Sequence, residues 1–306
     1  MARGSVVNLP RIALTVGDPA GIGPEIVAKA AADPGVRALC EPVIFASTPA
    51  AAFKMGEVSA AAGQAAYDTV VSAVEAARTG KVDAIATAPI NKLAFSLAGI
   101  PWKGHTDLLA HLCGGVRVAM LFHAPQLKVV LVTVHVPLRE VAALLTPDLV
   151  ADTIRLTAAS LPQFGIARPR LALAGLNPHA GESGLLGSED DAVLAPAVAS
   201  ARAGGIDIEG PFPADTVFVR ASRGEFDCVL ACYHDQGLIP VKLLAFGQAV
   251  NVTIGLPIIR TSVDHGTAFD IAGKGVAEAG SMIEAVKLAA YMTQSKFRPK
   301  PDATLP

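Results

Sequence analysis

Arg11-Ile-Ala-Leu-Thr-Val-Gly-Asp-Pro-Ala-Gly-Ile-Gly-Pro-Glu25 decides the fold class of this 306-residue chain. Its apolar first six residues predict a strand, its glycine-rich middle a turn, and Pro24 the first turn of a helix. Similar units recur. Strands are predicted over 11–16, 82–86, 118–122, 127–134, 170–174 and 226–232, and helices from about 24 and over 64–78, 147–161, 188–203 and 281–291. Such alternation indicates an α/β sandwich with a mainly parallel sheet.

The length allows two domains, and no linker stands out between them. We therefore expect two α/β/α domains that share a sheet or interleave. The expected first domain comprises residues 1–100 plus 265–306. The second, residues 101–264, is expected to carry the candidate metal ligands.

Composition excludes several classes of partner. The net charge is −2 and no run of Lys or Arg occurs, so neither a nucleic acid nor an anionic membrane has electrostatic support. Apolar stretches such as 127–136 fall short of the roughly 20 residues that span a membrane. Residues 1–5 lack the apolar core of a signal peptide, so we expect a cytoplasmic protein. Cys228 and Cys232 suggest a metal or redox pair or, the interpretation we favour, reduced cysteines in the core.

Three histidines follow three apolar runs. His135 and His234 end their runs directly, and His179 follows its run after a short turn. Ligands of open α/β sheets bind beyond the carboxyl ends of the strands, and three imidazoles there could hold one divalent ion. Alternatively, each histidine caps its strand by bonding a nearby backbone group. The spacings of 44 and 55 residues match no compact metal motif.

Other polar features have two interpretations each. The Gly17–Gly23 turn could bind an anion or simply need glycine dihedrals, and it lacks the G-x-G-x-x-G dinucleotide pattern. His105 and Thr106 could hold a phosphate or cap a helix. Lys242 and Arg260, in apolar surroundings, either extend to water or pair with a buried substrate anion. The polar, glycine-rich segment 264–275 suits a loop that wraps a polar ligand.

Several motifs taken together resemble one family. They are Thr15-Val-Gly-Asp-Pro-Ala-Gly-Ile-Gly-Pro-Glu25, Gly104-His-Thr-Asp107, Asn177-Pro-His-Ala-Gly-Glu182, Pro213-Ala-Asp-Thr216, Tyr233-His-Asp-Gln-Gly237 and Ile259-Arg-Thr-Ser-Val-Asp-His-Gly-Thr267. In this order, over residues 11 to 291, they resemble the 4-hydroxythreonine-4-phosphate dehydrogenase (PdxA) family. The resemblance implies a two-domain fold like that of the isocitrate and isopropylmalate dehydrogenases, and a homodimer with its site at the subunit boundary.

The resemblance also implies roles for individual residues. The implied metal ligands are His135, His179 and His234, for one divalent ion such as zinc, magnesium or cobalt. The implied substrate contacts are His105, Thr106, Lys242, Asn251 and Arg260. Segment 264–275 resembles the adenosine-binding loop of the isopropylmalate dehydrogenases, with NAD or NADP contacts at Asp264, His265, Gly266, Thr267, Ala268, Asp270 and Gly273. Asp215 and Asp235 are candidates for support of the metal ligands or proton transfer, and Lys242 is a further catalytic candidate.

The implied activity is NAD-dependent, metal-dependent oxidation and decarboxylation of 4-(phosphooxy)-L-threonine to 3-amino-2-oxopropyl phosphate, a step of the vitamin B6 pathway. Segment 48–64 is shorter than expected for such enzymes, and 233–244 and 266–271 resemble relatives acting on D-threonate or D-erythronate 4-phosphate. A third branch oxidises a cis-dihydrodiol carboxylate in terephthalate catabolism, but His105, Thr106 and Arg260 favour a phosphorylated substrate. A non-catalytic metal-binding or phosphate-binding module is the alternative from another class.

Overall fold

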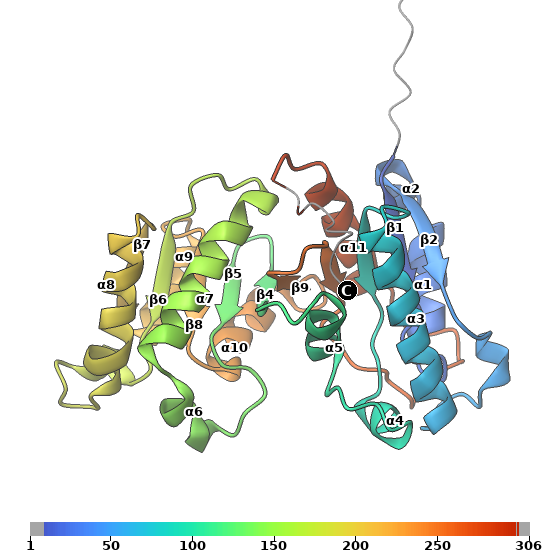
Figure 1. Cartoon of the computed structure of the whole chain (residues 1–306), viewed down its shortest axis with the longest axis horizontal. Helices are drawn as coiled ribbons and strands as arrows, with labels where there is room; N and C mark the ends of the chain where they lie inside the picture. Colours follow the sequence, from blue (N-terminus) through green and yellow to red (C-terminus); the bar gives the residue numbers. More distant parts are fainter. Residues whose placement is uncertain (1–8, 298, 300–306) are drawn as a thin grey trace, which may run out of the picture. The chain divides into compact units, whose positions relative to one another are not determined.

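The computed structural model describes residues 9–297 and 299, which form two compact units (Figure 1). Unit 1 comprises, of the described residues, 9–115, 256–294 and 299, and unit 2 comprises 116–255 and 295–297. Unit 2 thus forms a nearly continuous stretch of sequence between two parts of unit 1. The divisions fall near 115 and 255, whereas the sequence suggested 100 and 264.

Unit 1 contains parallel strands in the order β2-β1-β3-β10. Their bounds are β1 Arg11–Thr15, β2 Glu41–Phe45, β3 Ala84–Thr87 and β10 Arg260–Ser262. The helices are α1 Gly23–Ala32, α2 Pro34–Leu39, α3 Ala60–Arg78, α4 Lys92–Leu97, α5 His105–Leu112 and α11 Gly280–Thr293, with a 3-10 turn at Ala50–Ala52. Helices α3 and α11 both contact β1 and β3. Helices α1 and α2 pack beside α11, whereas α4 and α5 pack beside α3. The unit is therefore a layered α/β structure.

Unit 2 contains strands in the order β9-β4-β5-β8-β6-β7. Their bounds are β4 Ala119–His123, β5 Lys128–Leu131, β6 Leu171–Ala174, β7 Ile208–Phe212, β8 Cys228–Ala231 and β9 Val250–Ile254. Strand β4 is antiparallel to both β5 and β9, and β5, β8, β6 and β7 are parallel. A tight turn joins β4 to β5, in which the Ala124 N–H donates to the Leu127 carbonyl over 2.9 Å.

The helices of unit 2 are α6 Leu138–Leu144, α7 Pro147–Ser160, α8 Ala195–Ala203, α9 Ala214–Ser222 and α10 His234–Ala245. Short 3-10 turns occur at Leu161–Phe164 and Pro178–Gly181, and a π-helical turn occurs at Asp190–Leu194. The helix predicted over 188–203 is therefore π-helical in its first part. Thr146 caps α7 by accepting the Leu149 N–H, and Pro147 follows at the first helical position.

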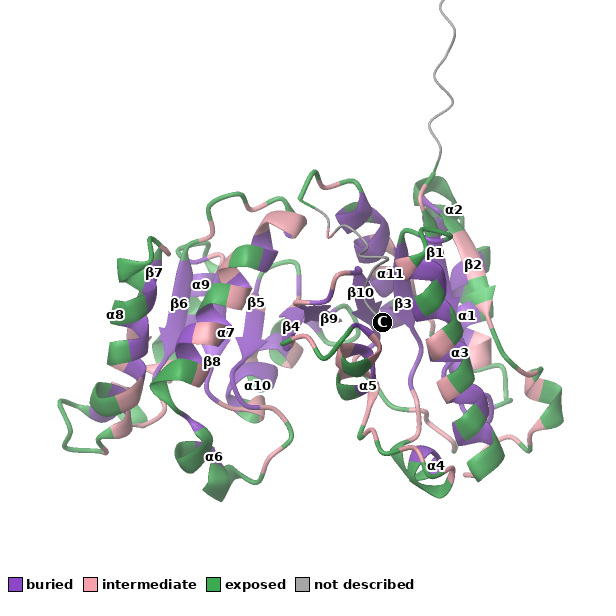
Figure 2. Ribbon diagram, in the orientation of Figure 1, coloured by how far each residue is buried: buried purple, intermediate pink, exposed green. Residues whose placement is uncertain are grey.

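Buried strands form the cores of both units (Figure 2). Residues 12–15, 84–87, 171–174 and 228–231 are all buried, as expected for strands covered on both faces. All four cysteines are free and buried, as expected for cysteines of the core. None of the helices within the described residues is long and apolar enough to cross a membrane. The α/β prediction is confirmed, although β4 makes the sheet of unit 2 mixed.

Candidate functional site

The three candidate metal ligands follow three neighbouring parallel strands. His135 follows β5, His179 lies in the 3-10 turn after β6, and His234 is the first residue of α10 after β8. Strand β8 pairs with β5 on one side and with β6 on the other. The topology therefore brings all three histidine-bearing segments to one edge of the unit 2 sheet, where ligands of α/β proteins bind.

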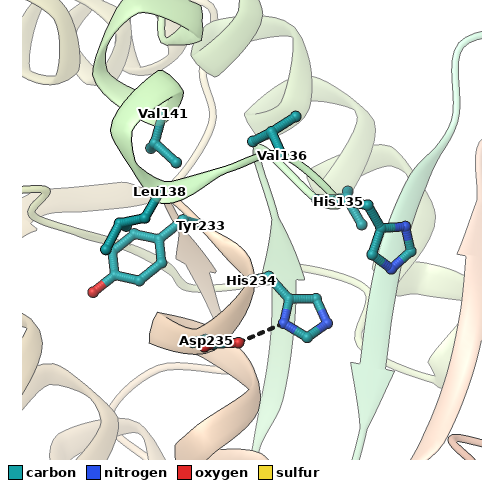
Figure 3. A pocket seen from close by; sticks show the side chains of 8 residues that line it. His135, Val136, Leu138, Val141, Tyr233, His234 and Asp235 are labelled. Carbon is teal, nitrogen blue, oxygen red and sulfur yellow. Dashed lines mark hydrogen bonds and ion pairs between the residues drawn. The ribbon is translucent and has the colours of Figure 1, made fainter.

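His135 and His234 are close neighbours at this edge. Their ring centroids are 5.6 Å apart with planes inclined at 41°, and the rings lie side by side in Figure 3. Asp235 Oδ1 lies 2.7 Å from His234 Nδ1, on the side of the ring away from His135. The pocket around them has a volume of about 270 Å³. It is lined by Val134, His135, Val136, Leu138, Val141, Tyr233, His234 and Asp235.

The separation of these rings suits a shared metal ion. Two imidazoles whose ring centroids are 5.6 Å apart are close enough for both to bind one ion through zinc–nitrogen bonds of about 2.0–2.1 Å. Asp235 also fits a supporting role: a carboxylate that accepts the Nδ1 proton leaves Nε2 of His234 free to bind a metal.

His179 stands apart from this pair. Its side chain is exposed, and its Nδ1 lies 3.3 Å from Glu182 Oε2, so it too has a carboxylate at Nδ1. Over residues 9–297 and 299, no three His, Cys, Asp or Glu side chains are grouped closely enough to hold a metal ion. The structure thus brings two of the three predicted ligands together and leaves the third on an adjacent turn.

The other candidates of unit 2 have different surroundings. Asp215 is exposed in the first turn of α9, whereas Asp235 bonds His234. Lys242 lies two turns beyond His234 on α10, and both line a pocket of about 570 Å³ with Asp235, Leu238, Ile239 and Leu243. Asn251 lies in β9, and its Oδ1 is buried without a hydrogen-bond partner among the described residues.

Unit 1 holds the candidate phosphate contacts His105, Thr106 and Arg260, which we call the anion cluster. Arg260 is buried, and His105 and Thr106 are half-buried. Arg260 is 2% exposed and donates from a guanidinium nitrogen to Thr87 Oγ1 over 2.7 Å. Burial lowers the pKa of Arg260 to about 9, so the guanidinium is still protonated at neutral pH. His105 starts α5, whose N-cap Gly104 offers no capping side chain.

His105 also matches an anion site. Its Nε2 is buried and has no hydrogen-bond partner within the described part of the chain. Burial, and then the nearby charge of Arg260, hold the pKa of His105 well below 6.5, so the imidazole is neutral. Buried polar atoms are nearly always hydrogen-bonded in folded proteins, so an unfilled position beside a buried cation fits an anionic ligand. Thr106 lies in the same helical turn and does not cap α5.

The loop over residues 264–275 packs on the glycine-rich turn that follows β1. The Ile22 N–H donates to the Thr267 carbonyl over 3.0 Å, and a Cβ on Gly21 would lie 2.9 Å from that oxygen. The N–H groups of Asp18, Ala20 and Gly21 also bond within the protein. The turn therefore needs glycine for close backbone packing, and these four N–H groups bond within the protein rather than to an anion.

Most candidate cofactor residues of this loop remain accessible. His265, Gly266, Asp270 and Gly273 are exposed, and Thr267 and Ala268 are half-buried. Asp264 Oδ1 accepts a 3.4 Å hydrogen bond from Ser281, the second residue of α11. Ala268 has a φ of 41°, in the left-handed region. The loop thus has a fixed base and an exposed polar outer side that could contact a nucleotide.

Comparison with known proteins identifies the family. Residues 24–289 match the family described as pyridoxal phosphate biosynthetic protein PdxA. The chain belongs to the PdxA family. A 4-hydroxythreonine-4-phosphate dehydrogenase from Desulforapulum autotrophicum is 44% identical over 92% of this chain and 95% of the relative. A D-threonate 4-phosphate dehydrogenase from Cupriavidus necator is also 44% identical, over 93% of this chain and 97% of that relative.

A solved structure agrees with this assignment. The 4-hydroxythreonine-4-phosphate dehydrogenase from Klebsiella pneumoniae is 41% identical, with a TM-score of 0.85 over 95% of this chain and 100% of that one. The resemblance drawn from the sequence motifs is therefore confirmed. Because these PdxA relatives are dehydrogenases, the chain is an oxidoreductase.

The sequence patterns alone missed several residues of this edge. Gln236, two residues after His234, bridges backbone groups of two strand ends, and Asp190 bonds the turn that carries His179. Neither residue has a distinctive spacing in the sequence. Their polar side chains in otherwise apolar segments were the available signal.

Proposed function

We propose that this PdxA family member is a NAD-dependent, divalent-metal-dependent dehydrogenase that oxidises and decarboxylates 4-(phosphooxy)-L-threonine to 3-amino-2-oxopropyl phosphate. The observation that carries the proposal is the His135–His234 pair, 5.6 Å apart, with Asp235 bonded to the far nitrogen of His234. A catalytic zinc site typically has three protein ligands and one position for water or substrate, so the pair needs a third ligand, for which we take His179.

In this proposal His135, His179 and His234 hold the ion. A divalent ion bound there supplies Lewis-acid polarisation of the substrate's hydroxyl and carbonyl oxygens. Imidazole ligands favour zinc or cobalt over magnesium, which prefers oxygen ligands. Asp235 fixes the ring of His234 by accepting its Nδ1 proton, and Glu182 is placed to do the same for His179.

The chain's own residues bind and orient the substrate. His105, Thr106 and Arg260 bind the phosphate, because a buried cation pairs more strongly with an anion than an exposed one does. Lys242 and Asn251 contact the remaining polar groups, and Lys242 is the candidate for proton transfer near the reacting carbons. NAD bound to this chain would accept the hydride lost from the hydroxyl-bearing carbon as the hydroxyl proton is released. The resulting β-keto acid would lose carbon dioxide and gain a proton at the carbon that bore it.

We assign the dinucleotide to the outer side of the loop over residues 264–275. The packing of its base against the Gly21 and Ile22 backbone gives it a fixed conformation, and its polar side chains are accessible. The proposed contacts are Asp264, His265, Gly266, Thr267, Ala268, Asp270 and Gly273. Comparison of the Kd values for NAD and NADP would identify the preferred dinucleotide.

The second candidate substrate is D-threonate 4-phosphate. The Cupriavidus necator relative with that name is as similar to this chain as the 4-hydroxythreonine-4-phosphate dehydrogenase from Desulforapulum autotrophicum. Apart from stereochemistry, the two compounds differ at carbon 2, which bears an ammonium group in one and a hydroxyl in the other. A cis-dihydrodiol carboxylate has no phosphate for the anion cluster, so we place it third.

We further propose a cytoplasmic homodimer. Ile239, Leu243 and Phe246, on or directly after α10, are 65%, 83% and 82% exposed. Exposed large apolar side chains that lie close together are typical of protein interfaces. Light scattering should give twice the chain mass for the wild type, and Leu243→Glu should give the monomer. A monomeric wild type would contradict this part of the proposal.

Steady-state NADH formation tests the activity. With zinc, cobalt or magnesium present, kcat/KM should be highest for 4-(phosphooxy)-L-threonine, with one carbon dioxide released per NADH. His179→Ala should abolish turnover while circular dichroism stays unchanged. Higher kcat/KM with D-threonate 4-phosphate would select the second candidate. Absence of NADH formation with every phosphorylated hydroxy acid would favour a binding module instead.

A further inference from the structure

His179 lies in a stretch of unusual backbone conformation. His179, Ala180, Glu182 and Ser183 have φ values between 44° and 56°, and the glycines at 181 and 184 have positive φ as well. Left-handed conformation is sterically unfavourable for residues other than glycine, because Cβ then lies too close to the following carbonyl oxygen. Such strain persists only where surrounding contacts hold it, and it is concentrated at functional sites.

Asp190 binds the segment that leads into this turn. Its carboxylate is fully buried and accepts the N–H of Leu176 over 2.9 Å and that of Asn177 over 3.1 Å. It also accepts the Asn177 side-chain amide over 3.0 Å. A Cβ on Gly175 would lie 2.8 Å from Asp190 Oδ1, so glycine is required there for close packing. Asp190 thus fixes the segment that leads into His179.

Gln236 connects this segment to the one that carries His234. Its Nε2 donates to the Gly175 carbonyl and its Oε1 accepts the Cys232 N–H, both over 2.7 Å. The residue is only 9% exposed, so water competes little for these bonds. Gly175 directly follows β6 and Cys232 directly follows β8, so one side-chain amide joins the ends of two strands.

The same network reaches the segment that carries His135. Thr133 Oγ1 donates to the Cys232 carbonyl over 2.7 Å, and the Thr133 N–H donates to the same oxygen over 3.2 Å. Hydrogen bonds therefore run from Thr133, two residues before His135, through Cys232 and Gln236 to Gly175. They continue through Asp190 to the turn of His179.

We propose that Asp190 and Gln236 are positioning residues that set the distance of His179 from the His135–His234 pair. The inference rests on the proposed metal site. Neither residue touches the ion or the substrate in this assignment. Each acts through backbone groups that carry the imidazoles. Groups that orient metal ligands from behind typically change metal affinity 10- to 100-fold when they are replaced.

Two variants that preserve side-chain size test the proposal. Gln236→Glu replaces the amide that donates to the Gly175 carbonyl with an oxygen. Asp190→Asn replaces one carboxylate oxygen with an NH₂ group, which cannot accept the backbone N–H of Leu176 or Asn177. Cobalt titration of the full-length protein, followed by d–d absorption, gives the metal affinity, and zinc competition checks it. We expect each variant to bind cobalt 10- to 100-fold more weakly than the wild type.

Two controls separate positioning from general loss of stability. Asp191→Asn makes the same chemical change one residue away on an exposed side chain and should bind cobalt like the wild type. Val198→Ala removes buried volume in α8, away from the turn, so it should lower Tm without weakening cobalt binding. If Val198→Ala, Gln236→Glu and Asp190→Asn have similar Tm values and bind cobalt equally weakly, the proposal is overturned.

The failure of this inference can be distinguished from that of the proposed function. If His179→Ala binds cobalt as tightly as the wild type, the metal assignment itself is wrong. If His179→Ala binds weakly while Gln236→Glu and Asp190→Asn bind normally, the metal site stands and the positioning role is refuted.

Discussion

Replacement of Arg260 by methionine is the most direct test of the anion cluster. Methionine has a similar length and no charge, so Arg260→Met removes the cation with little change in volume. Arg260 is 2% exposed and donates to Thr87 over 2.7 Å. Thr87 retains a 2.9 Å hydrogen bond to Ser262 in the variant, so its hydroxyl is not left unsatisfied.

The structure gives an expected magnitude. A hydrogen bond to a charged group contributes about 1.5–3 kcal/mol, so its loss should weaken phosphate binding about 10- to 150-fold. The free energy of unfolding should stay the same or rise, because an apolar side chain in place of a buried charge is often neutral or stabilising. The pKa of His105 should rise, because the nearby charge of Arg260 is one of the two causes that lower it.

Three measurements examine this variant. Calorimetry with inorganic phosphate gives Kd, steady-state kinetics give KM for the phosphorylated substrate, and NMR titration gives the pKa of His105. Arg223→Met, at an exposed position, is the matched control and should leave all three unchanged. Unchanged phosphate Kd and KM in Arg260→Met would refute the role of Arg260 as the phosphate anchor.

Three other predictions concern metal affinity, acid stability and cofactor binding. His234→Ala should abolish stoichiometric zinc binding in equilibrium dialysis. Asp235→Asn should weaken zinc binding about 10-fold, because Asp235 bonds Nδ1 of the His234 ring. Normal zinc binding by His234→Ala would contradict the assignment of His234 as a metal ligand. Burial, and then the charge of Lys128, lower the pKa of His123 from 6.5 to about 4. The free energy of unfolding is therefore unaffected by this residue above pH 6.5 and falls by up to about 3 kcal/mol as the pH falls toward 4, because the unfolded state binds the proton more tightly. His123→Phe should flatten the urea-unfolding free energy between about pH 7 and 4.5, and an unchanged slope would contradict the argument. Gly21→Ala would place a Cβ 2.9 Å from the Thr267 carbonyl, so Kd for NAD should rise several-fold in fluorescence titrations while cobalt affinity stays constant; unchanged NAD affinity would separate this loop from the cofactor.

Local sequence patterns were sufficient for elements whose surroundings are simple. Strands β1, β6 and β8 are short apolar runs between turns, and helices α3 and α7 have clear amphipathic patterns with Ser59 and Thr146 as caps. Burial on both faces and capping are local requirements, so they are visible in a single sequence. The positions of the three histidines after three strands could be predicted for the same reason.

Other strands were hidden because their stability comes from their neighbours. Strand β10 is Arg-Thr-Ser, a polar triplet that is buried through pairing with β3. Strand β7 contains Gly210 and Pro211, and β2 contains Pro42 and exposed residues. Such residues are unfavourable in isolated strand patterns but are tolerated near sheet edges.

Sequence by itself determined the α/β class, the PdxA motifs, the reduced cysteines and the histidines that follow strands, because each depends on residue type and local order. Only the tertiary structure decided that β5, β8 and β6 are neighbours, that His135 and His234 face one pocket, and that Asp190 and Gln236 join their segments. Strand order and hydrogen bonds between distant residues depend on how the chain packs as a whole. No local pattern encodes the 61-residue separation between Gly175 and Gln236.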